Sequence, residues 1–231
     1  MKGAAKIAVL YARKQSIYKK LCCDVWDKER DARLYRGRGP VVAHPPCRAW
    51  GRLKAFAKPE PGERDLAPLA VDVVRRNGGI LEHPEGSTLW REKDMPRPVE
   101  GKDAFGGYTV LINQSDFGHR AQKATWLYIV GIDIPDLPRA PVELGFPDRL
   151  VTQLGRAARE ATPERLARWL VEVAMCIDAA GQLRRGSQPD LAGQVEPGAN
   201  WPAPAPNEVA GAPGQVQRSQ PAAHGQLDFD W

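Results

Sequence analysis

The side chain best suited to covalent chemistry is a cysteine that follows two prolines. The segment HPPCRAWG places Cys47 directly behind Pro45 and Pro46. Each proline fixes a backbone φ angle, so the thiol is held in a stiff loop. A thiolate is a competent nucleophile, and a nearby cation promotes it by lowering the thiol pKa. The candidate cations are His44, Arg48, Arg52 and Lys123. The alternative is a small buried cysteine beside a structural turn.

A carboxylate lies in a second segment, ILEHPEGSTLW. Glu82 follows the apolar residues Ile80 and Leu81 and precedes His83. A carboxylate in this place can accept hydrogen bonds from the N–H and amino edge of a heterocycle. It can also protonate a ring nitrogen if its pKa is raised. The alternative, a surface or helix-terminal glutamate, is disfavoured by the apolar residues before it.

A third segment, QSDFGHRAQKATWLYIVG, spans residues 114–131. A turn at Gly118 leads through basic and polar residues into an apolar run. The side chains that could contact a substrate are His119, Arg120, Gln122, Lys123 and Thr125. The alternative is a basic hairpin without a ligand.

The spacing of apolar residues predicts elements that bring these segments together. Short apolar runs predict strands at 6–11, 40–43, 80–81, 108–112 and 126–130. Helical spacing predicts a helix over 63–77, ended by Asn77-Gly78-Gly79, and a late helix with Thr162 as N-cap and Pro163 as first residue. The order strand, helix, strand between residues 41 and 82 predicts a parallel pair whose carboxyl ends share one edge. Cys47 and Glu82 are then near each other in a Rossmann-like α/β fold, a mostly parallel sheet with flanking helices.

Composition divides the chain of 231 residues into two parts. Residues 1–185 are expected to form one compact α/β domain, and residues 186–231, rich in Pro, Gly and Ala, to be a disordered tail. The tail holds five carboxylates and one cation, Arg218, so its net charge is −4. Because the whole chain has a net charge of +5, residues 1–185 have a net charge of +9. Such a basic domain suits a polyanionic partner such as DNA. The alternative is a basic domain that binds no nucleic acid.

Other sequence features exclude several classes of protein. The four cysteines include an adjacent pair and two distant residues, which is no disulfide framework. No run approaches 18 consecutive apolar residues, and the amino end lacks the apolar core of a secretory leader. We expect a soluble protein of the cytoplasm, with no membrane partner.

Taken in order, the three segments resemble the DNA cytosine-5 methyltransferase family between about Val41 and Gly131. The matching features are PPC after a strand, a glutamate at a strand end, and FG followed by Gln/Lys-rich residues and LYIVG. The late helix ATPERLARWL resembles the closing segment of compact phage-borne relatives, as found with restriction–modification systems. The resemblance implies that Cys47 adds to C6 of an extruded cytosine and that Glu82 binds N3. It also implies that substrate contacts come from Arg48, His83, His119, Arg120, Gln122, Lys123 and Thr125.

The resemblance implies S-adenosylmethionine as methyl donor. The chain has no glycine between Gly3 and Gly37, where the family's cofactor loop would lie, and no room for a separate target-recognition domain. Asp24 and Asp27 are the acidic candidates for the cofactor ribose. Two other functions remain open: a catalytically degenerate relative that binds DNA or a partner protein, and a transferase acting on free pyrimidine nucleotides.

Two further patterns lie outside this scheme. His44, Cys47, His83 and His119 could form a His3Cys metal site if the segments converge. The histidines could instead serve as proton shuttles or as cations that activate the thiol, and the favoured alternative is that they only form turns. The last six residues, 226–231 (QLDFDW), resemble the QLxLxL peptide that docks on the bacterial replication sliding clamp.

Overall fold

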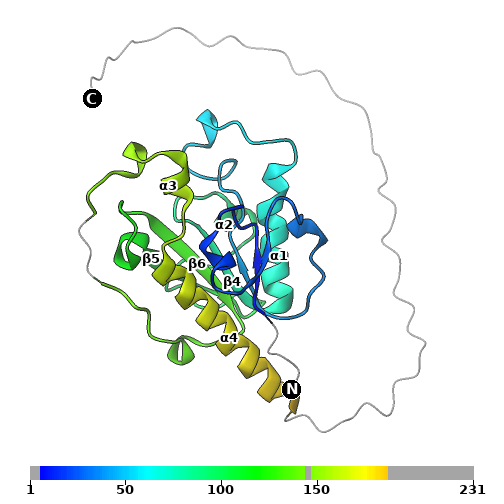
Figure 1. Ribbon diagram of the computed structural model, residues 1–231. Helices are drawn as coiled ribbons and strands as arrows, with labels where there is room; N and C mark the ends of the chain where they lie inside the picture. The colour runs from blue at the N-terminus through cyan, green and yellow to red at the C-terminus, as the bar shows by residue number, and fades with distance from the viewer. Residues whose placement is uncertain (1–5, 144–146, 187–231) are drawn as a thin grey trace, which may run out of the picture. The chain divides into compact units, whose positions relative to one another are not determined.

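A mostly parallel sheet forms the centre of the protein (Figure 1). The computed structural model describes residues 6–143 and 147–186. The strand order is β2-β1-β3-β4-β6-β5, with β1 to β4 parallel and β6 antiparallel to both of its neighbours. The strands are β1 (Ala8–Leu10), β2 (Asp24–Trp26), β3 (Val41–Ala43), β4 (Gly79–Pro84), β5 (Tyr108–Asn113) and β6 (Ala124–Val130). The predicted α/β class with a mostly parallel sheet is confirmed.

Two long helices cover opposite faces of the sheet. Helix α1 (Leu66–Asn77) packs with one set of strand residues, including Leu10 and Leu81, whereas α4 (Glu164–Gly186) packs with the alternate set, including Val9 and Ile80. This alternation follows from the period of two along a strand. The shorter helices are α2 (Leu89–Glu92) and α3 (Arg156–Glu160). The 3-10 turns are η1 (Ile17–Lys19), η2 (Ala32–Leu34), η3 (Lys54–Phe56), η4 (Glu63–Asp65), η5 (Gln114–Phe117), η6 (Ile134–Asp136) and η7 (Val151–Gln153).

The predicted strand–helix–strand unit is present as β3, α1 and β4. Its register pairs Val41 with Gly79 and Ala43 with Leu81. Glu82 therefore lies one residue beyond the end of β3, level with His44. This register brings the segment that contains Glu82 to the same edge as the segment that contains Cys47. The pairing of β4 with β6 brings the segment of residues 114–131 to that edge as well.

Several element boundaries differ from the prediction. Strand β4 continues through Glu82 to Pro84, because β6 pairs with it along its whole length. Residues 63–65 form a 3-10 turn, so α1 begins at Leu66. Helix α4 begins at Glu164, and the carbonyl of Pro163 accepts its first hydrogen bond, from Ala167. Strand β2 was not predicted.

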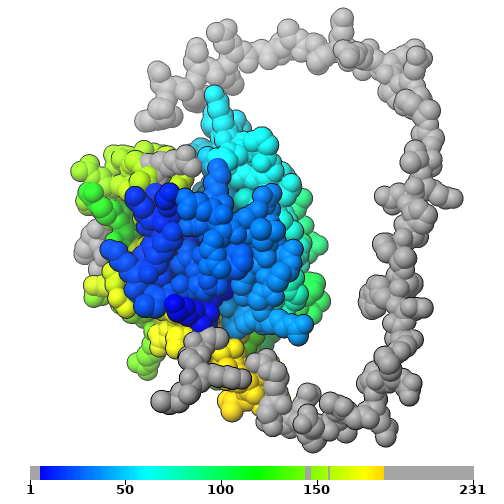
Figure 2. All heavy atoms as spheres, turned by 45° about the vertical axis from the view of Figure 1, so that its right-hand side comes forward, coloured from blue at the N-terminus to red at the C-terminus, as the bar shows by residue number. Residues whose placement is uncertain are grey.

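The segment between β1 and β3 contains β2 and two 3-10 turns but no α-helix. It appears in blue over much of the face shown in Figure 2. The chain divides into the units 1–189 and 190–231, and the whole second unit, including residues 226–231, lies outside the described residues. Among the described helices, none has the length and apolarity needed to cross a bilayer.

Candidate functional site

Polar side chains from four strands meet at the carboxyl edge of the parallel strands. His44 follows β3, Glu82 is in β4, and Gln114 follows β5. Because β6 is antiparallel, its first residues and Lys123 lie at the same edge. Figure 1 shows α3 near this edge, and Glu160 of α3 is close enough to Cys47 to affect its pKa. Open α/β sheets bind ligands at this edge.

The Glu82 carboxylate is the centre of the hydrogen-bond network. His44 Nδ1 lies 2.9 Å from Glu82 Oε2, and Gln114 Nε2 donates to Glu82 Oε1 at 2.9 Å. The same Gln114 nitrogen donates to Thr125 Oγ1 at 3.1 Å, and Lys123 Nζ donates to Gln114 Oε1 at 3.3 Å. The side chain of Glu82 is 11% exposed. Each carboxylate oxygen thus has one donor, and the group is reached from solvent only through a small opening.

Glu82 is ionised in this setting. Burial alone would raise its pKa, but the charge of Lys123 and the hydrogen bond from His44 outweigh burial and lower the pKa to about 2. At neutral pH the carboxylate is therefore a hydrogen-bond acceptor. The prediction that Glu82 is suited to bind a heterocycle edge is compatible with this state, whereas direct protonation by Glu82 is not.

The thiol of Cys47 is protonated at neutral pH, contrary to the expectation of an activated thiolate. Burial raises its pKa, Glu82 raises it further, and Lys123 lowers it in part. The other expected cations are engaged: Arg48 binds Glu63, Arg52 binds Glu85, and His44 binds Glu82. Glu82 and Lys123 both act on the thiol, so the three groups share one neighbourhood.

This arrangement predicts opposite effects of two substitutions on thiol reactivity. Glu82→Gln removes a negative charge, lowers the pKa of Cys47 and speeds its alkylation by iodoacetamide at pH 7.5 by about three- to tenfold. Lys123→Met removes the positive charge, raises the pKa and slows the reaction. Mass spectrometry of the peptide containing Cys47 measures both rates. Equal rates in the two variants would contradict the proximity of the three groups.

His44 has partners at both ring nitrogens. Its Nδ1 lies against Glu82, and its Nε2 is 2.8 Å from the hydroxyl of Tyr18. The Tyr18 and His44 rings are 5.2 Å apart, and Tyr18 is 1% exposed. Tyr18 comes from η1, after β1, so the network joins three neighbouring strands.

His83 lies on the other face of β4 from Glu82. It is fully buried beside Trp90, and burial lowers its pKa to about 4 against the opposing effect of Glu82. Its ring nitrogens, like the indole nitrogen of its cross-strand neighbour Trp126, have no hydrogen-bond partner among the described residues. His83 is therefore neutral and shielded, and the structure gives it no direct path to a substrate.

The remaining predicted substrate contacts are placed differently. His119 is buried, with its nitrogens against the carbonyls of Ala121 and Ala158, which ties the loop before β6 to α3. Arg120 pairs with Asp148 at the surface, and Gln122 is exposed. Of the predicted set, the structure brings Lys123 and Thr125 into the Glu82 network. His119 and Arg48 are engaged instead by protein groups outside that network.

The metal alternative finds no support in residues 6–143 and 147–186. Within these residues no group of three or more His, Cys, Asp or Glu side chains is arranged to hold a metal ion. Both nitrogens of His44 and of His119 are engaged by protein groups. His83 and His119 are buried in contacts of their own, apart from the hydrogen bond between His44 and Glu82.

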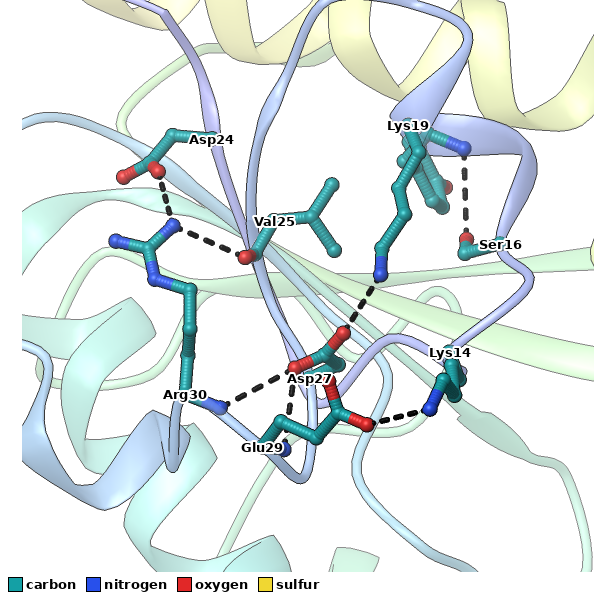
Figure 3. Close-up of polar contacts among 9 residues, drawn as sticks. Lys14, Ser16, Lys19, Asp24, Val25, Asp27, Glu29 and Arg30 are labelled. Atoms are coloured by element: carbon teal, nitrogen blue, oxygen red, sulfur yellow. Dashed lines mark hydrogen bonds and ion pairs between the residues drawn. The ribbon is translucent and has the colours of Figure 1, made fainter.

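The two acidic candidates for a cofactor occupy opposite ends of β2 (Figure 3). Asp27 follows the carboxyl end, where ribose-binding acids lie in doubly wound folds. It accepts hydrogen bonds from Lys19 Nζ at 2.7 Å and from the backbone amides of Glu29 and Arg30. Asp24 is the first residue of β2, roughly 10 Å back along the strand, and pairs with Arg30. Of the two candidates, Asp27 is therefore the one at the carboxyl end of the strand.

The turn after β1 does not have the form of a glycine-rich cofactor loop. Tyr11 takes the left-handed conformation with φ 60°, although a bulky residue rarely does so. Its side chain packs against the core beside α1. Because Tyr11 fills this turn and the Asp27 oxygens are already bonded, these residues do not fit S-adenosylmethionine as they stand.

Two surface cavities, of about 460 and 360 Å³, lie along α4 rather than at this edge. Both include Arg168 and Glu172, and neither is lined by Cys47 or Glu82.

Sequence reasoning missed Tyr18 and Gln114. Gln114 opens the third segment, and its position directly after a predicted strand was the available signal. Tyr18 lies in a stretch where no element was predicted, so nothing in the sequence linked it to His44. Comparisons with protein-family models, curated proteins and solved structures give no match to this chain.

Proposed function

We propose that this chain is a DNA-modifying enzyme in which Cys47 adds to C6 of an extruded cytosine and makes C5 reactive. The observation that carries the proposal is the strand register, which puts Glu82 of β4 level with the residues that follow β3, from which Cys47 comes, at the sheet edge that also holds Lys123. A thiol beside a carboxylate that accepts hydrogen bonds suits nucleophilic addition to a pyrimidine whose N–H edge is held. The ring must leave the duplex to reach this site.

The chemical step is an addition followed by its reversal. The thiol gives its proton to solvent, an S–C6 bond forms, and the electrons of the C5–C6 double bond are pushed through C4 to N3, which takes a proton from solvent. Glu82, as a carboxylate, accepts a hydrogen bond from the N3–H that forms. C5 then accepts an electrophile. Solvent then takes the original C5 hydrogen as a proton, the C6–S bond breaks to return the Cys47 thiolate, and N3 gives back its proton, which restores the aromatic ring.

The sheet order supports a Rossmann-like reading of the fold. Strands β2-β1-β3-β4 follow the 2-1-3-4 order of doubly wound sheets, in which the ligand binds at the switch point between β1 and β3. His44 and Cys47 follow β3 directly and thus lie beside this point. The electrophile that reaches C5 is not specified by these residues, and S-adenosylmethionine as methyl donor rests on the sequence resemblance alone.

Exchange of the cytosine C5 hydrogen tests the proposal without any cofactor. Addition at C6 lets C5 take a deuteron from D2O, so digested DNA should contain cytosine one mass unit heavier. A catalytically degenerate DNA-binding protein would retain DNA without exchange, and an enzyme for free nucleotides would exchange cytidine nucleotides instead.

DNA as partner is supported by a projecting basic turn next to the thiol. The segment from Arg52 to Lys58 follows Cys47 closely, and η3 projects from the molecule in Figures 1 and 2. Phe56 is 86% exposed and is flanked by exposed Lys54 and Lys58. Cations beside an exposed aromatic ring suit phosphates and an opened base stack.

Replacing Lys54 and Lys58 together with serine should weaken duplex binding and lower the salt slope of log K by about 2, because two phosphate contacts are lost. Fluorescence anisotropy over a salt series measures both. Lys102→Ser is the control, since Lys102 pairs with Asp133 after β6, at the opposite edge. An equal loss in the control would mean that binding is a diffuse charge effect.

The resemblance of residues 226–231 to a clamp-binding peptide adds the replication sliding clamp as a second proposed partner. Alternate apolar residues on an extended peptide suit a groove with spaced pockets. Removing residues 226–231 should abolish co-purification with the clamp while leaving DNA binding unchanged.

A further inference from the structure

We propose that Tyr18 and His44 are positioning residues that hold the Glu82 carboxylate in one orientation through a directed chain of hydrogen bonds. This inference deepens the proposed function, on which the role of Glu82 toward a substrate rests. The chain consists of two contacts, Tyr18 hydroxyl to His44 Nε2 at 2.8 Å and His44 Nδ1 to Glu82 Oε2 at 2.9 Å.

The direction of the chain follows from the protonation of its ends. An ionised carboxylate only accepts hydrogen bonds, so His44 Nδ1 carries the proton that faces Glu82. The hydroxyl of Tyr18, whose pKa burial raises well above its ordinary value, keeps its proton and donates it to Nε2 when that nitrogen carries none. The donor and acceptor of each hydrogen bond in the chain are therefore defined, from the Tyr18 hydroxyl through His44 to Glu82.

The three groups have the same order, carboxylate, imidazole and hydroxyl, as the triad that activates a serine nucleophile. Here the hydroxyl is buried and the carboxylate is at the sheet edge, so the carboxylate is the group that faces a substrate. Tyr18 is 1% exposed, so its hydroxyl cannot reach a substrate. Glu82 lies at the sheet edge near Cys47. The pair Tyr18 and His44 thus acts through Glu82 and touches no substrate.

The chain holds the carboxylate in place and does not conduct a proton. Moving a proton along the chain from Tyr18 through His44 to Glu82 would leave a tyrosinate in the core. Burial and the negative charge of Glu82 both disfavour that ion. Glu82 therefore remains an acceptor.

The consequence concerns the ring that the site accepts. His44 and Gln114 each donate to a different oxygen of Glu82, and each oxygen keeps lone-pair capacity for one more donor. Two donors on adjacent ring positions complement this carboxylate, as in a cytosine protonated at N3 with its amino group at C4. A uracil or thymine ring offers one N–H beside a carbonyl, so the inference favours aminopyrimidines.

NMR of the free protein tests the chain. Selectively ¹⁵N-labelled histidine should show His44 as the Nδ1–H tautomer. With ¹³C-labelled glutamate, Glu82 should stay ionised down to about pH 3, and Tyr18→Phe should raise its pKa by about one unit, because the donor that orders His44 is lost. Loss of the signal in Glu82→Gln assigns it.

Tyr108→Phe is the matched control. Tyr108 is a buried tyrosine of β5 whose hydroxyl has no hydrogen-bond partner among the described residues, so its removal should leave the Glu82 pKa unchanged. An Nε2–H tautomer of His44 in the unmodified protein would overturn the inference, as would equal Glu82 pKa values in the two variants. The tautomer needs no variant, so misfolding of Tyr18→Phe cannot leave the question open. The NMR experiments use the free protein without DNA, so their outcome does not depend on whether C5 exchange occurs. Failure of C5 exchange would refute the proposed function and leave this inference standing.

Discussion

Replacing Cys47 with alanine should lower the rate of cytosine C5–H exchange in duplex DNA by roughly a thousandfold or more. The sulfur forms the only covalent bond to C6 in the proposed step, so nothing else in the site makes C5 reactive. The variant should keep its fold and its affinity for DNA, because Cys47 is partly exposed and belongs to neither of the two buried clusters described above. Mass spectrometry of digested DNA after incubation in D2O measures the rate.

Cys23→Ala is the control for this result. Cys23 is also a partly buried cysteine with a raised pKa, but it packs at the face covered by α4. Its removal should leave exchange unchanged. Exchange that persists in Cys47→Ala would assign the nucleophile elsewhere and contradict the site.

Replacing Gly79 with alanine should destabilise the fold by roughly 3 kcal/mol. Gly79 has φ 128°, which disfavours any residue with a Cβ. A Cβ at this position would overlap the carbonyl oxygen and amide nitrogen of Val41 in β3. Because these are backbone atoms, relief requires β3 and β4 to move apart, and with them His44 and Glu82. Urea unfolding measures the loss.

Gly39→Ala serves as its counterpart, since nothing lies within 4 Å of the added Cβ and its backbone is not left-handed. We expect its free energy of unfolding to stay within about 0.5 kcal/mol of the original. A similarly small effect of Gly79→Ala would mean that the register between β3 and β4 is less constrained than described.

The sequence predicted the elements that the core requires. Apolar runs identified five of the six strands, and the rule that a strand–helix–strand unit is parallel placed Cys47 and Glu82 at one edge. The apolar pattern did not predict β2, because Asp24–Trp26 is only three residues long and lies among charged residues. Its strand state comes from pairing with β1, which is a tertiary contact.

The protonation of the site could not be read from the sequence. Arg48 and Arg52 are near Cys47 along the chain, but each has a carboxylate partner, Glu63 and Glu85. Those pairings depend on how η4 and the end of β4 pack, so sequence proximity gave the wrong sign for the thiol pKa. Tyr18 and Gln114 enter the network for the same reason, through packing between distant segments.

The nucleosides of DNA from cells that produce this protein test the central claim most directly. Expression of the unmodified chain should add a cytosine derivative substituted at C5, and its mass identifies the transferred group. Cells with Cys47→Ala or Glu82→Gln should lack it at equal protein levels. Unchanged nucleosides with the unmodified chain, or the same new nucleoside with Cys47→Ala, would contradict the account.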